Sequence, residues 1–225
     1  MTRLPAFLLA PIVLAQARGL RRDVPRLPAA EPRAGGSRAS DAVRLLVLGD
    51  STAVGTGVEQ MADAVAGQIA KRIADPVAWR VVGASGLTSQ QVRDQHLAAA
   101  VAEPFDAVVL LVGWNDALRL RSDRDFAADV AGLLDALYAA SPAARQVLVL
   151  PPRFMDFAVL PQPLRHAIGA HIVGLTRTAV RVATEHGAAM VAGFDGVHVA
   201  SDGFHPDAAG YAGLAERIVA ALELD

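Results

Sequence analysis

Four short polar segments of the chain carry the residue types needed for nucleophilic chemistry on an acyl group. The segments are Gly49–Thr52, Ser85–Gly86, Gly113–Asp116 and Asp202–His205. A serine hydroxyl beside an imidazole can lose its proton as it attacks a carbonyl carbon, and a carboxylate can orient that imidazole. Backbone N–H groups and an asparagine amide can stabilise the oxyanion that forms. The chemistry predicted from these residue types is ester hydrolysis through a serine nucleophile.

Ser51 is the candidate nucleophile because it directly follows the apolar run Val43–Leu48. At the end of a strand its hydroxyl would face a cleft, and its own N–H could help to stabilise an oxyanion. Asp50 and Ser51 could instead do no more than cap a turn. A phosphate-binding loop is poorly supported, because the Lys and Ser/Thr that complete that motif are missing and no G-x-G-x-x-G occurs.

The second and third segments offer candidate oxyanion donors. The N–H of Gly86 could point into the cleft, although a glycine here could equally serve a turn with positive φ. Asn115 follows a strongly apolar run, and its side-chain amide could donate to the oxyanion or cap the next helix. Asp116 and Asp50 are expected to anchor the loops behind the reacting atoms rather than to take part in the chemistry.

The candidate base and its orienting carboxylate are His205 and Asp202, which lie three residues apart near the C-terminus. One short loop can carry both groups, with the carboxylate accepting a hydrogen bond from the imidazole. Asp195 and His198 have the same spacing seven residues earlier. The later pair is favoured because a helix-opening Pro–Asp sequence follows it directly.

The elements that must position these residues alternate between short apolar runs and longer helical patterns. The runs lack polar alternation, which is typical of parallel strands covered on both faces. They are Val43–Leu48, Trp79–Val82, Ala107–Val112, Gln146–Leu150 and Ala188–Ala192. Predicted helices span Glu59–Ile73, Ser89–Val101, Asp125–Ala140, Leu164–Glu185 and a last segment from Pro206 to about Leu222. This alternation predicts a doubly wound α/β sheet that binds ligands beyond the carboxyl ends of its strands.

Length and composition favour one domain with a sizeable core. The chain has 225 residues and a formal net charge of −2, so nothing indicates a nucleic-acid partner. It has no cysteine, which excludes disulfides, thiolate catalysis and cysteine-based metal sites. The domain is expected to span residues 41–225, preceded by an N-terminal segment and linker over residues 1–40.

The N-terminal segment allows several interpretations. Leu4–Ala15 is apolar and Ala15–Ala17 resembles a signal-peptidase site, but arginines follow at once, where exported proteins usually avoid them. The apolar run is short for a membrane span. It could instead form an amphipathic helix that packs on the domain or makes peripheral contact with a membrane. Export or membrane association is therefore about as well supported as a cytoplasmic location. Asp23–Ser40, rich in Pro, Arg, Gly and Ser, is interpreted as the linker.

The four polar segments, in this order, resemble the four sequence blocks of the GDSL-type or SGNH hydrolase superfamily. The resemblance extends from Arg44 to about Ile218, and Thr52 stands where Leu is commoner. It implies a flavodoxin-like three-layer α/β/α sandwich with a five-stranded parallel sheet. It also implies no metal and no organic cofactor. The resemblance implies a catalytic triad of Ser51, His205 and Asp202. It also implies an oxyanion hole whose donors are the N–H groups of Ser51 and Gly86 and the side chain of Asn115.

An α/β-hydrolase is the related alternative, since its triad has the same chain order. That fold places its serine in a G-x-S-x-G elbow, whereas Ala53 here occupies the position of the last glycine. Its Asp and His also usually lie on separate loops. The resemblance to the GDSL type is therefore preferred.

The expected partner is a small-molecule ester with a short-chain or lipid-like acyl group. Trp114 and Phe154 are candidate substrate contacts, although such side chains could equally cover the edge of the sheet. Two other functions stay open at this point. One is acyl transfer by the same triad to an acceptor other than water, and the other is a non-catalytic binding module on the same fold.

Overall fold

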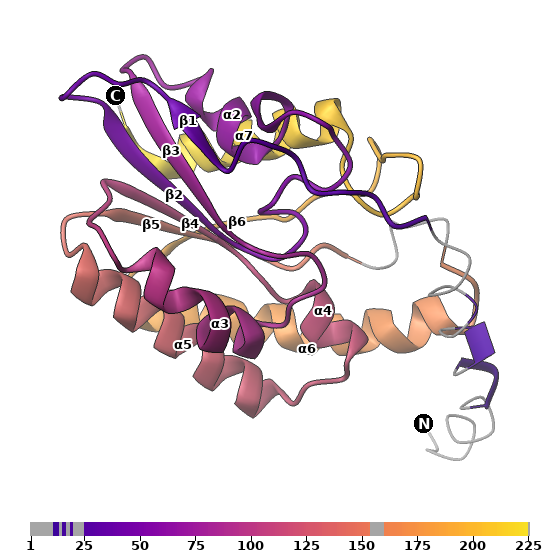
Figure 1. Ribbon diagram of the computed structural model, residues 1–225. Coiled ribbons are helices and arrows are strands. Elements are labelled where there is room, and N and C mark those ends of the chain that lie inside the picture. The colour runs from indigo at the N-terminus through magenta and orange to yellow at the C-terminus, as the bar shows by residue number, and fades with distance from the viewer. Residues whose placement is uncertain (1–10, 14, 17–18, 20–24, 154–159, 225) are drawn as a thin grey trace.

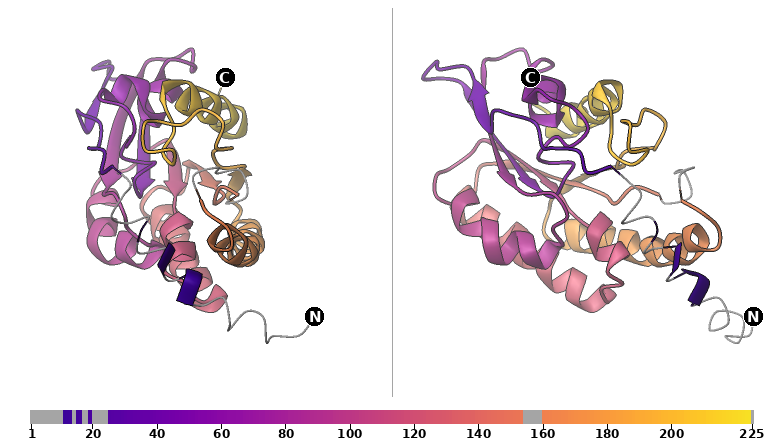
Figure 2. Two further views of the ribbon diagram at one scale, coloured as in Figure 1. Left: turned by 90° about the vertical axis from the view of Figure 1, so that its right-hand side faces the viewer. Right: turned by 45° about the vertical axis from the view of Figure 1, so that its right-hand side comes forward.

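The predicted three-layer α/β/α architecture is confirmed. The computed structural model describes residues 11–13, 15–16, 19, 25–153 and 160–224. One sheet lies between two layers of helices, as Figure 1 shows, with α2 and α7 on one face and α3, α5 and α6 on the other. Figure 2 shows the same layers from two further directions.

The sheet has six strands in the order β1-β3-β2-β4-β5-β6. In chain order they are β1 (Ala34–Gly36), β2 (Val43–Gly49), β3 (Val77–Gly83), β4 (Ala107–Leu111), β5 (Arg145–Val149) and β6 (Ala189–Val191). Strands β2 to β6 are parallel and correspond to the five predicted strands. The sixth, β1, pairs antiparallel with β3 at one edge.

Strand β1 lies within the range interpreted from its composition as a linker. Its two glycines permit a close approach to β3, since a Cβ on Gly35 would lie 2.6 Å from the Trp79 ring. Backbone bonds from Ser37 N–H to Val77 O and from Val81 N–H to Arg33 O, both 2.8 Å, extend the pairing. Glycine-rich composition therefore marks close packing here rather than a free linker, and folded structure begins before residue 41.

The described helices are α2 (Val65–Ala70), α3 (Ser89–Ala100), α4 (Trp114–Leu118), α5 (Asp123–Ala140), α6 (Leu164–Glu185) and α7 (Ala208–Leu222), with a 3₁₀ turn η1 at Met61–Asp63. The helix predicted over Glu59–Ile73 is therefore two short pieces, because Ala64 between them is extended with ψ 177°. Asp207 is the N-cap of α7, accepting from Gly210 N–H at 2.9 Å, so Pro206 precedes the helix rather than starting it.

The core consists of two apolar clusters, one on each face of the sheet. Successive residues of β2 supply both, with Leu46 and Leu48 on the α3–α5–α6 side and Leu45 and Val47 on the α2–α7 side. All four side chains are fully buried. Burying such a side chain contributes roughly 1.5–3 kcal/mol, which explains why this strand has no polar alternation.

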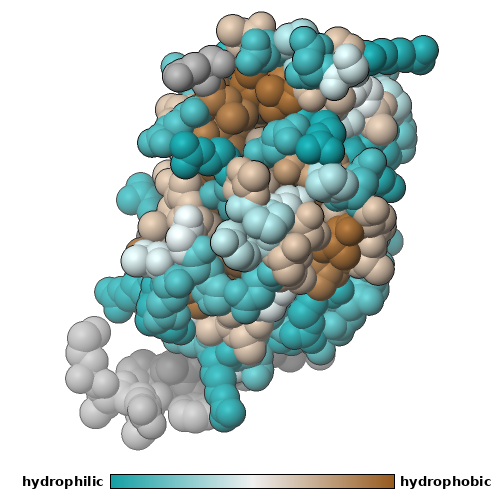
Figure 3. Space-filling model, turned by 90° about the vertical axis from the view of Figure 1, so that its left-hand side faces the viewer, coloured by the Kyte–Doolittle hydropathy of each residue, from teal (hydrophilic) through white to brown (hydrophobic). Residues whose placement is uncertain are grey.

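The described part of the N-terminal segment contacts the domain. Val13 packs against the cluster on the α3–α5–α6 side, and Gln16 donates to Gln162 O at 2.6 Å and accepts from Leu164 N–H at 3.0 Å. Within the described ranges, no helix combines the length and apolar character needed to cross a bilayer. The face at the amino ends of the strands, shown in Figure 3, is mostly hydrophilic with separate apolar areas.

At the carboxyl ends of the strands, glycines bring three backbone segments close together. Gly49 of β2 pairs with Gly83 of β3, and each sits beside the end of a neighbouring strand. A Cβ on Gly83 would lie 1.9 Å from Gly49 O, and one on Gly49 would lie 2.0 Å from Leu111 O. No side chain fits at either position, so the loops after β2, β3 and β4 start from one small area.

We expect Gly83→Ala to destabilise the fold by about 3 kcal/mol or more, because φ is +141° and the added methyl meets the backbone. The matched control is Gly132→Ala inside α5, where a Cβ would make only an ordinary 3.7 Å contact with Arg93. That change should stabilise by about 0.5–1 kcal/mol. Urea unfolding of both variants measures the two effects, and equal stabilities would contradict the close strand-end packing.

Candidate active site

A cleft of about 770 Å³ lies where the strands β2, β3 and β4 end. Residues 25–27, the turn after β2, residues 85–87, helix α4 and residues 202–205 form its walls. Six residues that the sequence predicted for the site line it, namely Ser51, Gly86, Trp114, Asn115, Asp202 and His205. Asp50 and Asp116 are buried behind them. Phe154, predicted as a substrate contact, lies outside the described residues.

Ser51 lies in a tight turn that leaves its hydroxyl in the cleft. The turn is held by hydrogen bonds from Asp50 N–H to Leu111 O at 3.1 Å and from Thr56 N–H to Ser51 O at 2.9 Å. The Ser51 side chain is only 6% exposed, yet its hydroxyl forms no hydrogen bond with any described residue. A nearly buried hydroxyl that opens only into the cleft is suited to attack a bound molecule.

Two backbone N–H groups beside Ser51 are also without acceptors. Within the described chain, neither the Ser51 N–H nor the Gly86 N–H donates to any oxygen. Gly86 has φ +82°, and Arg119 donates to its carbonyl oxygen at 3.1 Å, which fixes the orientation of this peptide. Two unpaired N–H groups on one cleft can stabilise a developing negative charge.

The Asn115 side chain lies close to the same place, on the first turn of α4. Its Nδ2 donates to Leu87 O at 3.0 Å and, at a longer 3.4 Å, to Asp50 Oδ2. The first bond ties α4 to the loop after β3. The second is at the limit of hydrogen-bond distance, so that N–H is the one available to an oxyanion.

His205 and Asp202 form a close pair in the loop before α7. The His205 Nδ1 and Asp202 Oδ2 atoms are 2.5 Å apart, and Asp202 Oδ1 accepts from the N–H groups of Phe204 and His205 at 2.9 and 3.0 Å. Burial opposes the ionisation of Asp202, but these hydrogen bonds outweigh it and lower the pKa of the carboxyl. The paired carboxylate therefore stays charged and leaves the imidazole Nε2 free.

The earlier Asp–His pair is built differently. Asp195 is exposed and its Oδ1 accepts from Val197 N–H at 3.1 Å, while His198 contributes its backbone oxygen to Asp207 N–H at 3.0 Å. Neither residue lines the cleft. The spacing alone did not separate the two pairs, whereas the loop geometry does.

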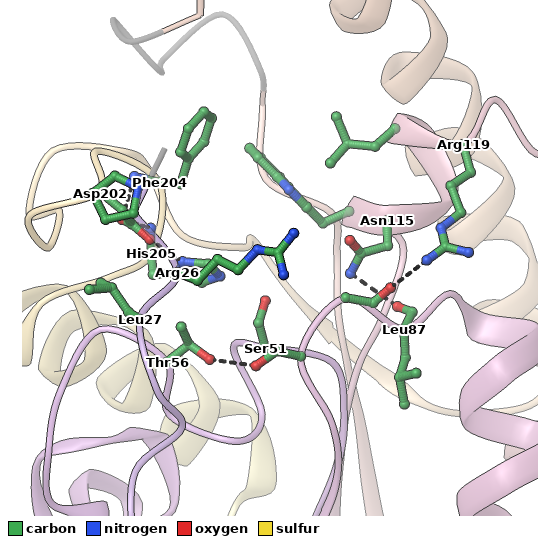
Figure 4. Close-up of a pocket in the computed structure, with 15 residues that line it drawn as sticks. Arg26, Leu27, Ser51, Thr56, Leu87, Asn115, Arg119, Asp202, Phe204 and His205 are labelled. Atoms are coloured by element: carbon green, nitrogen blue, oxygen red, sulfur yellow. Dashed lines mark hydrogen bonds and ion pairs between the residues drawn. The ribbon is translucent and has the colours of Figure 1, made fainter. Parts of the chain in front are cut away.

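No described hydrogen bond joins Ser51 Oγ to His205 Nε2. Both residues nevertheless line the same cleft. Figure 4 shows His205 at one side of the open space, Ser51 below it and Asn115 on the side opposite His205. Such contacts are often long without a substrate and shorten when one binds. The arrangement can deliver a nucleophile, a base and oxyanion donors to a single carbonyl group.

A buried network supports the oxyanion side of the cleft. Asp116 accepts from Ser89 N–H at 2.9 Å and from Ser89 Oγ at 2.7 Å, and Arg121 Nε lies 3.2 Å from its carboxyl. Burial dominates and raises the pKa of Asp116, while these partners act in the opposite direction. Because Ser89 opens α3 and Asp116 lies on α4, the pair fixes Gly86 relative to Asn115. In the described part of the chain no cluster of His, Asp or Glu is arranged to hold a metal ion.

Several residues of the cleft were not singled out as site residues from the sequence, although Ser85 and Phe204 lie in two of the four polar segments. They are Pro25, Arg26, Leu27, Thr56, Ser85, Leu87, Leu118, Arg119 and Phe204. An aromatic residue inside the Asp–His loop was a signal that could have identified Phe204, whose ring packs edge-on against Trp114 at 6.2 Å. No sequence signal pointed to residues 25–27, since their composition resembles a linker.

Asp50 is the most perturbed acid near the cleft. It is fully buried behind Ser51, and burial raises its pKa to about 7 despite hydrogen bonds from Thr52 N–H and Asn115 Nδ2. The folded protein therefore holds this proton more tightly than the unfolded chain, whose carboxyl has the ordinary value of 3.8. The stability that results is present below about pH 4 and is lost as the pH rises through 7.

We expect wild type to lose up to about 4 kcal/mol of stability relative to Asp50→Asn between pH 4 and pH 8. Asn keeps an oxygen for Thr52 N–H but cannot ionise. The control is Asp106→Asn, because the side-chain bond from Arg44 lowers the pKa of Asp106, and its effect should stay constant between pH 5 and 8. Urea unfolding from pH 4 to pH 8 tests both variants. Parallel profiles for wild type and Asp50→Asn would contradict a raised pKa of the buried Asp50 carboxyl.

Comparison with known proteins gives a family match over most of the domain. Residues 47–212 match the GDSL-like lipase/acylhydrolase family. This range includes all four polar segments that the sequence predicted to carry the chemistry. No curated protein matches the chain.

Solved structures share the fold over nearly their whole length. TesA is 25% identical with a TM-score of 0.62, and the match covers 80% of this chain and 98% of TesA. An aryl esterase of M. smegmatis is 20% identical with a TM-score of 0.61, covering 80% of this chain and all of that chain. The acetylxylan esterase Axe2 of Geobacillus stearothermophilus is 17% identical with a TM-score of 0.60, covering 83% and 98%.

Proposed function

Because the chain belongs to the GDSL-like lipase/acylhydrolase family and is in general terms an ester hydrolase, we propose that it cleaves carboxylic esters through an acyl-enzyme on Ser51. One observation carries the proposal. The Ser51 hydroxyl and two N–H groups are unpaired among the described residues and open into the cleft that also holds the Asp202–His205 pair. These are the parts that acyl transfer needs, gathered at one place.

In the first half of the reaction, His205 Nε2 takes the proton of Ser51 as Oγ attacks the carbonyl carbon. The Asp202 carboxylate accepts from His205 Nδ1, so the tautomer is fixed and the imidazolium that forms is stabilised. The carbonyl oxygen becomes an oxyanion held by the N–H groups of Ser51 and Gly86 and by Asn115 Nδ2. His205 then gives its proton to the leaving alcohol, and the acyl group stays on Ser51.

In the second half, water enters where the alcohol left. His205 takes a proton from that water as its oxygen attacks the acyl carbon, and the same donors hold the second oxyanion. The acid departs as Ser51 regains its proton. Acyl transfer to another acceptor would use the same intermediate, so product analysis with an added alcohol separates hydrolysis from transfer.

For the substrate we propose an ester with a short-chain or lipid-like acyl group. The cleft walls include apolar side chains from four segments of the chain, namely Leu27, Leu87, Trp114, Leu118 and Phe204. The edge-on contact of Trp114 with Phe204, with ring planes at 73°, gives this wall a fixed shape. A cleft of about 770 Å³ is within the size range of small-molecule sites.

Replacing Ser51 by Ala should reduce the turnover of p-nitrophenyl esters by a factor of about 10⁴ or more, because the nucleophile is lost. The matched control is Ser85→Ala, another serine of the same cleft, whose hydroxyl bonds Thr56 Oγ1 at 2.8 Å. We expect less than about a tenfold loss there, since only a neutral hydrogen bond is removed. Rates measured with esters of different acyl length also show how long an acyl chain the pocket accepts. Near-native turnover in Ser51→Ala would exclude this mechanism.

Asn115→Ala should lower kcat by about a hundredfold to a thousandfold with little change in KM, because the oxyanion exists only along the reaction path. Since Asn115 also bonds Leu87 O, thermal unfolding of the variant must accompany the kinetics. A rise in KM at constant kcat would instead show that Asn115 binds the ground-state ester.

A further inference from the structure

The N-terminal arm, residues 25–33, lines the cleft with its first residues and is bonded to the domain through its later ones. Ala30 is fully buried and its N–H donates to Val54 O at 3.0 Å. Glu31 N–H donates to Glu59 O at 3.2 Å, and Glu31 O accepts from Met61 N–H at 2.9 Å. The arm is thus bonded to the segment that follows Ser51, and its first residues reach into the cleft.

Two arginines face each other across this cleft. Arg26 enters from the His205 side and its guanidinium points toward the middle, while Arg119 lies on the Asn115 side, as Figure 4 shows. Arg119 uses one nitrogen to hold Gly86 O. Arg26 forms no hydrogen bond or ion pair with any described residue, so all its donors are available.

The charge of the cleft is opposite to that of the whole chain. The protein carries a net charge of −2, yet the charged residues lining the cleft are Arg26, Arg119, Asp202 and His205 if protonated. Asp202 already pairs with His205 at 2.5 Å. The cleft therefore has an uncompensated positive charge, and a cleft of one sign attracts ligands of the other.

We propose that Arg26 selects esters whose alcohol portion carries an anionic group, either phosphate or carboxylate. This inference rests on the proposed function, in which His205 protonates the departing alcohol, so the alcohol must lie on the His205 side of the cleft. Arg26 enters from that side and presents the planar donor set that binds phosphate and carboxylate oxygens. Arg119 adds a second positive charge across the cleft.

The test compares three butyryl esters with the full-length chain, using a pH-stat to follow acid release. The neutral ester is 1-butyrylglycerol, the phosphate ester is 1-butyrylglycerol 3-phosphate and the carboxylate ester is 4-(butyryloxy)butanoate. We expect wild type to show at least a tenfold higher kcat/KM for one or both anionic esters, because a charge-assisted pair at a partly exposed site contributes about this factor. Comparison of the two anionic esters shows whether phosphate or carboxylate is preferred.

Arg26→Gln should reduce that preference, the ratio of kcat/KM for an anionic ester to kcat/KM for the neutral ester, about tenfold. Arg26→Lys should restore part of it, since it keeps the charge but not the planar donor set. The control is Arg38→Gln, which removes the same charge from an exposed position outside the cleft and should leave the preference intact. Raising NaCl to 0.5 M should lower the wild-type preference toward that of Arg26→Gln.

The outcomes separate this inference from the function on which it rests. Hydrolysis of 1-butyrylglycerol that depends on Ser51, with no preference for either anionic ester, would overturn the inference alone. An anionic preference that survives in Arg26→Gln, or falls equally in Arg38→Gln, would also overturn it. Failure of wild type to hydrolyse any of the three esters would contradict the proposed function itself and the inference with it.

Discussion

The site depends on the close approach of three backbone segments at the carboxyl ends of β2, β3 and β4. Gly49 and Gly83 make that approach possible, because the positions of their missing side chains are filled by carbonyl oxygens of the neighbouring strands. Three segments of the site begin in this small area, namely the turn with Ser51, the loop with Gly86 and the helix with Asn115. A serine, an amide and an unpaired N–H can converge on one carbonyl only because the strands end so close together.

In and behind the cleft, three buried aspartates show three different solutions to the cost of burying a carboxyl group. Asp202 is stabilised as an anion by a histidine and two N–H groups, and its pKa is lowered. For Asp116 burial prevails over the hydrogen bonds of Ser89, and for Asp50 it prevails enough to bring the pKa to about 7. Only Asp202 is positioned to act on the reaction through His205, and the other two hold loops in place.

The parallel strands, the longer helices and the residues at the ends of the strands could be predicted from the sequence, because each follows from local patterns of apolar runs, turns and caps. The 22 residues of α6, for example, were predicted with the bounds that the structure has. The break at Ala64 and the sixth strand could not be predicted in the same way. The sixth strand depends on the packing of Gly35 against Trp79, a partner that the tertiary fold sets. The break at Ala64 accompanies the close approach of Gly67 to Met61 O.

The same limit explains why the composition of the arm is typical of a linker although the arm is bonded to the domain. Proline, arginine and glycine are typical of linkers when their backbone is exposed, but here the backbone of Ala30 and Glu31 bonds to the segment that follows Ser51. A residue of such an arm can serve the site only if the arm is fixed, since a freely moving arginine would lose most of its binding energy to the entropy of ordering it. The backbone bonds of Ala30 and Glu31 lower that cost, because they hold the arm beside the cleft that Arg26 lines.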